Sequence, residues 1–150
     1  MKRFRFRLKK VLDHRIQLYE VARTKHADVV RKLRREEAKL ESLRDTYKTC
    51  LFELAEKMKK KFRVLDLGPY YRYMTFIKKE IAQQIQIVYQ ALQEEEARRK
   101  ELMQAAKEKE ILNKLKEKYY SEYVYTLNQE EQKFIDDITA SKYARAGRRR

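Results

Sequence analysis

The sequence predicts an all-α protein in which two long helices form an antiparallel coiled-coil hairpin. Two observations on composition lead to this prediction: the 150-residue chain has only 2 Gly and 1 Pro, and 41% of its residues are charged while 43% are hydrophobic. Because turns depend on Gly and Pro, few turns are expected. A charged fraction well above the roughly 25% of an ordinary domain, combined with many strong helix formers, is typical of a coiled coil.

The only Gly-Pro pair, Gly68-Pro69, predicts the turn between the two helices. Glycine commonly ends a helix, and proline suits the first turn of the next one. We therefore expect a single coiled-coil hairpin over 1–150. Its predicted parts are helix 1 at about 4–63, the turn at about 64–69, helix 2 at about 70–146 and a basic tail at 147–150.

The first predicted helix has a continuous heptad repeat. Position a is apolar, aromatic or His throughout, at Leu12, Tyr19, His26, Leu33, Leu40, Tyr47 and Leu54. Position d is mostly apolar, at Leu8, Arg15, Ala22, Val29, Glu36, Leu43, Cys50 and Lys57. A repeat sustained over this length predicts a coiled-coil seam. The polar d residues are expected either to weaken the seam or to set its register.

The second predicted helix has an apolar stripe with a gap in it. Before the gap the stripe contains Tyr73, Phe76, Ile77, Ile81, Ile85, Val88 and Leu92. After the gap it contains Leu102, Leu112, Leu115, Tyr119, Tyr123, Leu127, Phe134 and Ile138. Residues 94–110 have strong helix propensity but few large apolar side chains, so we expect this stretch to be helical with looser packing.

The formal net charge of +15 indicates a partner of negative potential, which could be an acidic protein surface, nucleic acid or an anionic lipid face. A solvated helix surface with a basic bias is the alternative. Basic residues gather near the predicted turn, at Lys57, Lys59, Lys60, Lys61, Arg63, Lys78 and Lys79, and near both termini. Cys50 is the only cysteine, which excludes an intramolecular disulfide and suits a reducing cytoplasm. No apolar run suggests a secretory signal or a membrane span.

The residues give no indication of catalysis, of a cofactor or of a metal site. His14 and His26 have no metal-ligand spacing to each other or to Cys50, and two glycines cannot form a phosphate-binding loop. Carboxylate clusters on a two-helix surface lack the cleft that would shift their pKa values. We therefore expect a non-enzymatic protein. The 11 tyrosines, several of them beside arginine, indicate a protein interface.

Several segments together resemble the FliJ family of flagellar export proteins over nearly the whole chain. They are the opening 4–12 (FRFRLKKVL), the segment 70–77 (YYRYMTFI) after the predicted turn, and the segments 114–120 (KLKEKYY) and 131–137 (EQKFIDD). Their order and spacing, the chain length and the basicity all agree with that family. Asp136-Asp137 stands where Asp-Glu is more usual in the family.

The resemblance implies a non-enzymatic component of the flagellar type III export apparatus. Such proteins act as a coiled-coil stalk, similar to the central stalk of rotary ATPases, in the ring of the hexameric export ATPase, and they promote assembly of that ring. They also contact the cytoplasmic domain of the export gate membrane protein and handle export chaperones. The implied location is cytoplasmic, peripheral to the inner membrane at the flagellar base.

The resemblance also implies two sets of binding residues. The export-gate set carried over by motif position is Leu40, Leu43, Tyr47, Phe76, Gln83 and Ile87. Glu80, between Phe76 and Gln83, stands where the resemblance leads us to expect an apolar residue. By analogy with a stalk whose terminal half enters the ring, the expected ATPase-ring set is Arg5, Arg7, Lys9, Tyr123 and Arg145.

Two other functions compete with the export role. A basic helical hairpin with Tyr and Arg could bind RNA through its backbone and by stacking, although here the basic residues are interspersed with Glu rather than gathered on one face. A purely structural spacer is the other alternative, and the exposed tyrosines and basic ends argue against it. Attachment to an anionic membrane through the basic ends is compatible with export.

Overall fold

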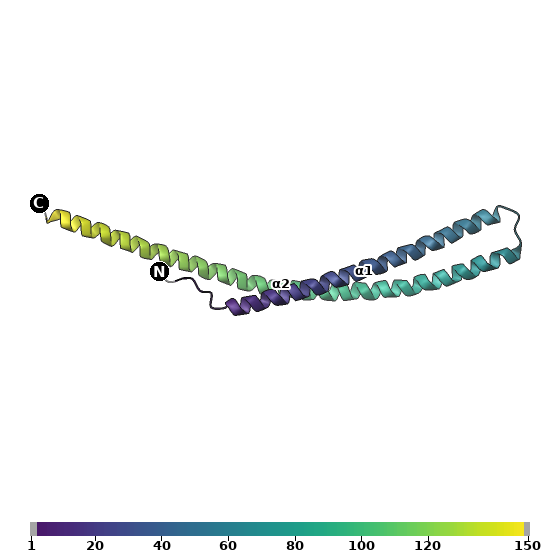
Figure 1. Cartoon of the computed structure of the whole chain (residues 1–150), viewed down its shortest axis with the longest axis horizontal. Coiled ribbons are helices and arrows are strands. Elements are labelled where there is room, and N and C mark those ends of the chain that lie inside the picture. The colour runs from purple at the N-terminus through teal and green to yellow at the C-terminus, as the bar shows by residue number, and fades with distance from the viewer. Residues whose placement is uncertain (1–2, 149–150) are drawn as a thin grey trace. The chain divides into compact units, whose positions relative to one another are not determined.

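The computed structural model describes residues 3–148 and contains two antiparallel helices, α1 (Lys9–Met58) and α2 (Val64–Gly147), joined by a loop at 59–63 (Figure 1). No strand occurs among the described residues. The predicted all-α hairpin is confirmed. The chain packs as two compact units, one containing the residues up to Leu18 and from Ala105 onward, and the other Tyr19–Gln104. Each unit contains a segment of both helices.

The heptad predicted for the first helix is the packed face of α1. Every a and d side chain from position 8 to position 57 is buried or partly buried. In the second unit, one core cluster joins Leu33 and Leu40 of α1 to Val88 and Ala91 of α2. A second cluster contains Cys50, Leu54, Leu67 and Met74. The spacing of the apolar residues therefore identified the inward face of α1 correctly.

The packed face of α2 in the second unit differs from the predicted stripe. Two interleaved sets, each spaced by seven residues, are buried or partly buried: Leu67, Met74, Ile81, Val88, Glu95 and Leu102, and Tyr70, Ile77, Gln84, Ala91 and Arg98. The prediction was wrong for four members of the stripe, namely Tyr73, Phe76, Ile85 and Leu92, which are exposed. Inward-facing Gln84, Glu95 and Arg98 interrupt the apolar pattern, and their polar side chains concealed the true repeat.

In the first unit, the later part of the predicted stripe is only partly packed. The side chains of Leu112, Leu115, Tyr123 and Leu127 are partly buried, as predicted. Those of Tyr119, Phe134 and Ile138 are exposed, contrary to the prediction. Every residue from 128 to 148 is exposed, so this stretch of α2 has no packed face.

The polar residues of the α1 seam each have a partner on α2. Arg15 pairs with Glu108 at 2.5 Å, and His26 Nε2 lies 3.0 Å from Glu95 Oε1. The Glu36 carboxylate accepts a hydrogen bond from the Gln84 amide at 2.6 Å. Lys57 Nζ lies 5.1 Å from the centre of the Tyr70 ring. Lys32 adds a further pair with Glu94 at 3.1 Å. These contacts favour the interpretation that the polar positions set the register. They also explain how residues 94–110 pack with few apolar side chains.

The Glu36–Gln84 contact is the most enclosed of these polar pairs. The Gln84 side-chain amide donates to both the Glu36 carboxylate, at 2.6 Å, and the Glu36 backbone carbonyl, at 3.0 Å. The hydrogen bond from Gln84 lowers the pKa of the Glu36 carboxyl below its ordinary value of 4.5, and the nearby Lys39 and Lys32 lower it further, while burial opposes them. The charged carboxylate is therefore favoured in the folded state.

The turn lies earlier than predicted, at 59–63 rather than about 64–69. Helix α2 begins at Val64, because the Asp66 carboxylate accepts a hydrogen bond from the Arg63 backbone N–H at 3.3 Å and Asp66 N–H donates to the Arg63 carbonyl at 2.9 Å. An acidic residue in the third position of a helix caps its start in this way and suits the helix dipole. Gly68 and Pro69 consequently lie within α2, and Gly68 has no positive φ.

The chain before α1 is not helical, contrary to the predicted start at about residue 4. Helix α1 begins at Lys9, and the segment before it contacts α2 in the first unit. Phe4 lies 5.3 Å from the Tyr120 ring and 5.6 Å from the Tyr123 ring, and Phe6 lies 6.2 Å from the Tyr119 ring. Because apolar and basic residues alternate over 3–8, which we call the extended segment, its aromatic side chains pack against α2 while its basic ones face outward. At the other end, α2 extends through Gly147, and Arg149 and Arg150 of the predicted basic tail lie outside the described residues.

Replacing Gly68 with alanine should stabilise the protein. A Cβ atom at Gly68 would meet no other heavy atom within 4 Å, and glycine within a helix costs roughly 0.5–1 kcal/mol relative to alanine. Chemical unfolding followed by circular dichroism should therefore show a higher free energy of unfolding for Gly68→Ala. If Gly68 instead formed a left-handed turn, as the sequence suggested, the same substitution would lower it.

The Glu36–Gln84 contact should make stability depend on pH. Because the pKa of Glu36 is lowered by folding, its contribution is fully present above the unfolded pKa of about 4.5 and is lost as the pH falls through the folded pKa. Thermal unfolding of the wild type and of Glu36→Gln should therefore differ most near neutral pH, and the difference should shrink in acid. Comparison with the variant removes the effect of the other carboxyls. A difference that stays constant with pH would contradict the assignment.

Candidate protein-binding surfaces

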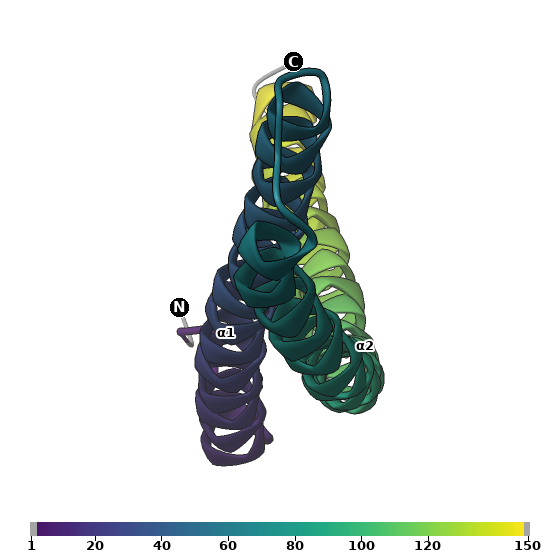
Figure 2. The same cartoon turned by 90° about the vertical axis from the view of Figure 1, so that its right-hand side faces the viewer.

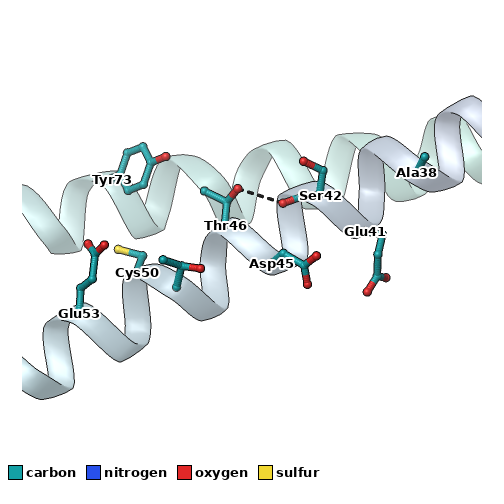
Figure 3. A pocket seen from close by; sticks show the side chains of 9 residues that line it. Ala38, Glu41, Ser42, Asp45, Thr46, Cys50, Glu53 and Tyr73 are labelled. Carbon is teal, nitrogen blue, oxygen red and sulfur yellow. Dashed lines mark hydrogen bonds between the residues drawn. The ribbon is translucent and has the colours of Figure 1, made fainter.

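The described residues leave large apolar side chains exposed on both helices. Among the described residues, no group of three or more His, Cys, Asp or Glu side chains could hold a metal ion. A groove along α1 in the second unit has Tyr73 of α2 at its side, and within it Thr46 Oγ1 donates to the Ser42 carbonyl at 2.9 Å (Figure 3). The remaining lining residues are Ala38, Glu41, Asp45, Thr49, Cys50 and Glu53. Most of these side chains are exposed, so the groove does not exclude water as a catalytic cleft does.

The three export-gate residues predicted on α1 belong to the packed seam. Leu40 is buried in the core cluster with Leu33, Val88 and Ala91. Leu43 and Tyr47 are partly buried at seam positions, and the Lys78 ammonium lies 5.7 Å from the centre of the Tyr47 ring. Leu40 therefore offers a partner almost no surface, and Leu43 and Tyr47 offer only part of theirs.

The three export-gate residues predicted on α2 are exposed together. Phe76, Gln83 and Ile87 are separated by seven and four residues, a spacing that brings side chains to the same side of a helix. Tyr73 is also exposed and lies one turn before Phe76. We call these four residues, Tyr73, Phe76, Gln83 and Ile87, the lateral surface of α2. Three of the six predicted export-gate residues therefore lie together on an exposed side of α2. Tyr73 lies on the same side, and its spacing of three residues from Phe76 is the signal in the sequence that points to it.

A second exposed apolar stripe lies on the opposite flank of α2. It contains Ile85, Tyr89 and Leu92, at spacings of four and three residues. Apolar spacing along the sequence assigns Ile85 and Leu92 to the seam, which conceals this stripe. Inward Gln84, Val88 and Ala91 separate the two flanks, and each flank can therefore contact a different partner.

The predicted ATPase-ring residues do not form one patch. Arg5, Arg7 and Lys9 are exposed on and just after the extended segment, whereas Tyr123 is partly buried beneath Phe4. Arg145 is exposed in the last turn of α2, about 33 Å beyond Tyr123 along the helix axis at 1.5 Å per residue. Tyr123 therefore holds the extended segment in place, while the arginines and Lys9 remain accessible.

The end of α2 also exposes apolar side chains. Phe134, Ile135, Ile138 and Tyr143 are exposed within residues 128–147, which we call the lone segment of α2. Exposed apolar residues gathered on one element commonly mark an interaction site. Their spacing continues the apolar stripe and so predicts seam positions for Phe134 and Ile138, although α1 does not cover them.

A helical hairpin that leaves apolar side chains exposed on both of its helices is typical of proteins that bind other proteins. The chain matches the family model FliJ, described as flagellar FliJ protein, over residues 4–148, and it therefore belongs to the FliJ family. Comparisons with curated proteins and with solved structures found no match. Members of the FliJ family are non-enzymatic components of the flagellar export apparatus.

Neither helix, over the residues described, has a stretch long and apolar enough to cross a bilayer.

Proposed function

We propose that this protein acts as a coiled-coil stalk in the ring of the hexameric export ATPase, where it promotes ring assembly and connects the ring to the export gate and to export chaperones. The site of action would be cytoplasmic and peripheral to the inner membrane at the flagellar base. Family membership supports a role in the export machinery. The separate exposed surfaces on the two units support contact with more than one partner.

The lone segment of α2 is the main observation behind the ring contact. Twenty or so consecutive helical residues have no packed face, and the segment nevertheless exposes Phe134, Ile138 and Tyr143. Phe134, Ile135 and Ile138 lie within about one turn on the same side of the helix, and a helix with such an exposed apolar patch gains stability when a partner covers it. Exposed Arg5, Arg7 and Arg145 belong to the same unit and would complement an acidic ring lining.

The lateral surface of α2 supports the contact with the cytoplasmic domain of the export gate. Phe76 and Ile87 supply apolar anchors, and Gln83 between them supplies a polar group. Exposed aromatic and aliphatic side chains with a polar neighbour are the composition of an interface centre. Because Leu40 lies in the seam, its contribution to the contact would be to hold α2 in place.

Removing the apolar anchors of the lateral surface should weaken gate binding without unfolding the protein. The double variant Phe76→Ala with Ile87→Ala should raise the Kd for the purified cytoplasmic domain of the export gate by about thirtyfold or more, since truncating an interface anchor costs about 2 kcal/mol. Isothermal titration calorimetry would measure this change, and circular dichroism would check that the helix content is unaltered.

The opposite flank of α2 offers a matched control for that experiment. Tyr89→Ala with Ile85→Ala removes an aromatic and an isoleucine whose exposed fractions, 56% and 42%, match the 55% of Phe76 and the 42% of Ile87. This control variant should bind the gate domain as the wild type does. Equal loss of affinity in both double variants would argue against a specific role for the lateral surface.

Reversing the charges of the extended segment should reduce stimulation of the export ATPase. Arg5→Glu with Arg7→Glu should raise the protein concentration needed for half-maximal ATP hydrolysis by at least about tenfold, because like charges facing each other in an interface cost several kcal/mol. Phe134→Ser with Ile138→Ser should have a similar effect by removing apolar contact from the lone segment. ATP hydrolysis and electron microscopy of ring assembly would provide the measurements.

The control for the charge effect is Arg34→Glu with Arg35→Glu, which changes the net charge by the same amount. Both arginines are exposed on α1 in the other unit. This variant should stimulate hydrolysis as the wild type does. If all three variants stimulate the ATPase normally, neither the extended segment nor the lone segment contacts the ring.

A further inference from the structure

The end of the hairpin where α1 meets α2 is strongly basic. Positions 57–65 contain five basic residues and no acidic one: Lys57, Lys59, Lys60, Lys61 and Arg63. The flanking acids are engaged locally, since Glu56 pairs with Lys59 at 3.0 Å and Asp66 caps the start of α2. We call residues 57–65 the tip. Figure 2 shows its loop closing the hairpin between the two helices.

The tip also contains the most exposed large apolar side chains of the described chain. Leu65 is 87% exposed and Val64 is 81% exposed, in the first turn of α2, and Met58 and Phe62 are exposed as well. Neither Val64 nor Leu65 belongs to a core cluster. Capping by Asp66 fixes these residues in the helix, so their exposure is a consequence of where α2 begins.

The residue types at the tip distinguish between partners. Protein interfaces are depleted in Lys and enriched in Tyr, Trp and Arg, whereas four of the five basic residues here are lysines. Single-stranded nucleic acid is bound by stacking on aromatic rings, and the tip has only Phe62. Clusters of lysines next to aliphatic side chains instead match an anionic bilayer, which attracts the charges and accepts the aliphatic groups at its boundary.

We propose that the tip docks on an anionic lipid surface. Val64 and Leu65 enter the boundary between headgroups and acyl chains, while Lys60, Lys61 and Arg63 lie among the lipid phosphates. The long stems of the lysines allow their ammonium groups to remain at the headgroup level as the apolar side chains enter. This proposal depends only on the charge and exposure of the tip. It would hold whichever proteins the lateral surface and the lone segment bind.

Vesicle co-sedimentation of the full-length protein tests the proposal. Vesicles of phosphatidylcholine with phosphatidylglycerol should bind the protein at least about tenfold more strongly than vesicles of phosphatidylcholine alone, and high salt should weaken the binding. Lys60→Glu with Lys61→Glu should lower the partition coefficient by at least about tenfold. Val64→Ser with Leu65→Ser should also lower it by about tenfold, because it removes the inserted groups.

Two matched controls separate tip docking from general attraction of a basic protein to anionic lipid. Arg34→Glu with Arg35→Glu changes the net charge equally, and Val21→Ser with Leu51→Ser removes an exposed valine and leucine elsewhere on the hairpin. Both should bind as the wild type does. The chain has no tryptophan, so Leu65→Trp gives a single reporter whose emission should shift to the blue on anionic vesicles, whereas Val21→Trp should not shift.

Three results would overturn the proposal. They are equal binding to neutral and anionic vesicles, unchanged binding of the Val64 and Leu65 double variant, and a tryptophan emission of the Leu65→Trp variant that does not respond to lipid. Absence of vesicle binding would point instead to an acidic protein surface as the partner of the tip. None of these results would affect the ATPase or gate experiments, because those variants lie outside the tip.

Discussion

The register between α1 and α2 is the constraint on which the binding surfaces depend. A two-helix coiled coil covers only one face of each helix, so the register decides which side chains remain available to partners. Here the seam alternates apolar clusters with polar pairs, such as Glu36 with Gln84 and His26 with Glu95. A shift of one heptad would separate each polar side chain from its partner, and a partly buried charge without a partner is costly. The polar pairs therefore select one register, while the apolar layers supply most of the stability.

This register has a direct consequence for α2, which exposes apolar residues on both sides of its packed face. Since Gln84 and Ala91 face inward, Phe76 and Ile87 lie on one flank and Ile85 and Tyr89 on the other. In an isolated helix, apolar residues distributed in this way would not define one hydrophobic face. In the hairpin it becomes two separate stripes. A small contact area within the molecule thus leaves much apolar surface for assembly with other proteins.

The elements of the hairpin differ in how far the sequence predicts them. The heptad of α1 is regular, and all its a and d positions pack as predicted. The seam of α2 could not be predicted from apolar spacing, because Gln84, Glu95 and Arg98 belong to it. Gly68-Pro69 predicts the turn because glycine and proline are its usual signals, whereas the cap formed by Asp66 starts α2 five residues before Pro69. Of the predicted gate residues, Phe76, Gln83 and Ile87 share an exposed face, and those of α1 lie in the seam.

The sequence alone determined that the chain is helical, that it folds as a hairpin, that α1 packs through its heptad, and that its segments resemble the FliJ family. These properties follow from composition and local periodicity, which depend only on residues that are close together in the sequence. Only the tertiary structure decided which polar residues face one another, where the turn lies, and which apolar residues of α2 remain uncovered. Those features depend on contacts between residues as far apart as Arg15 and Glu108, and no local pattern specifies the partner of a charged side chain across a seam.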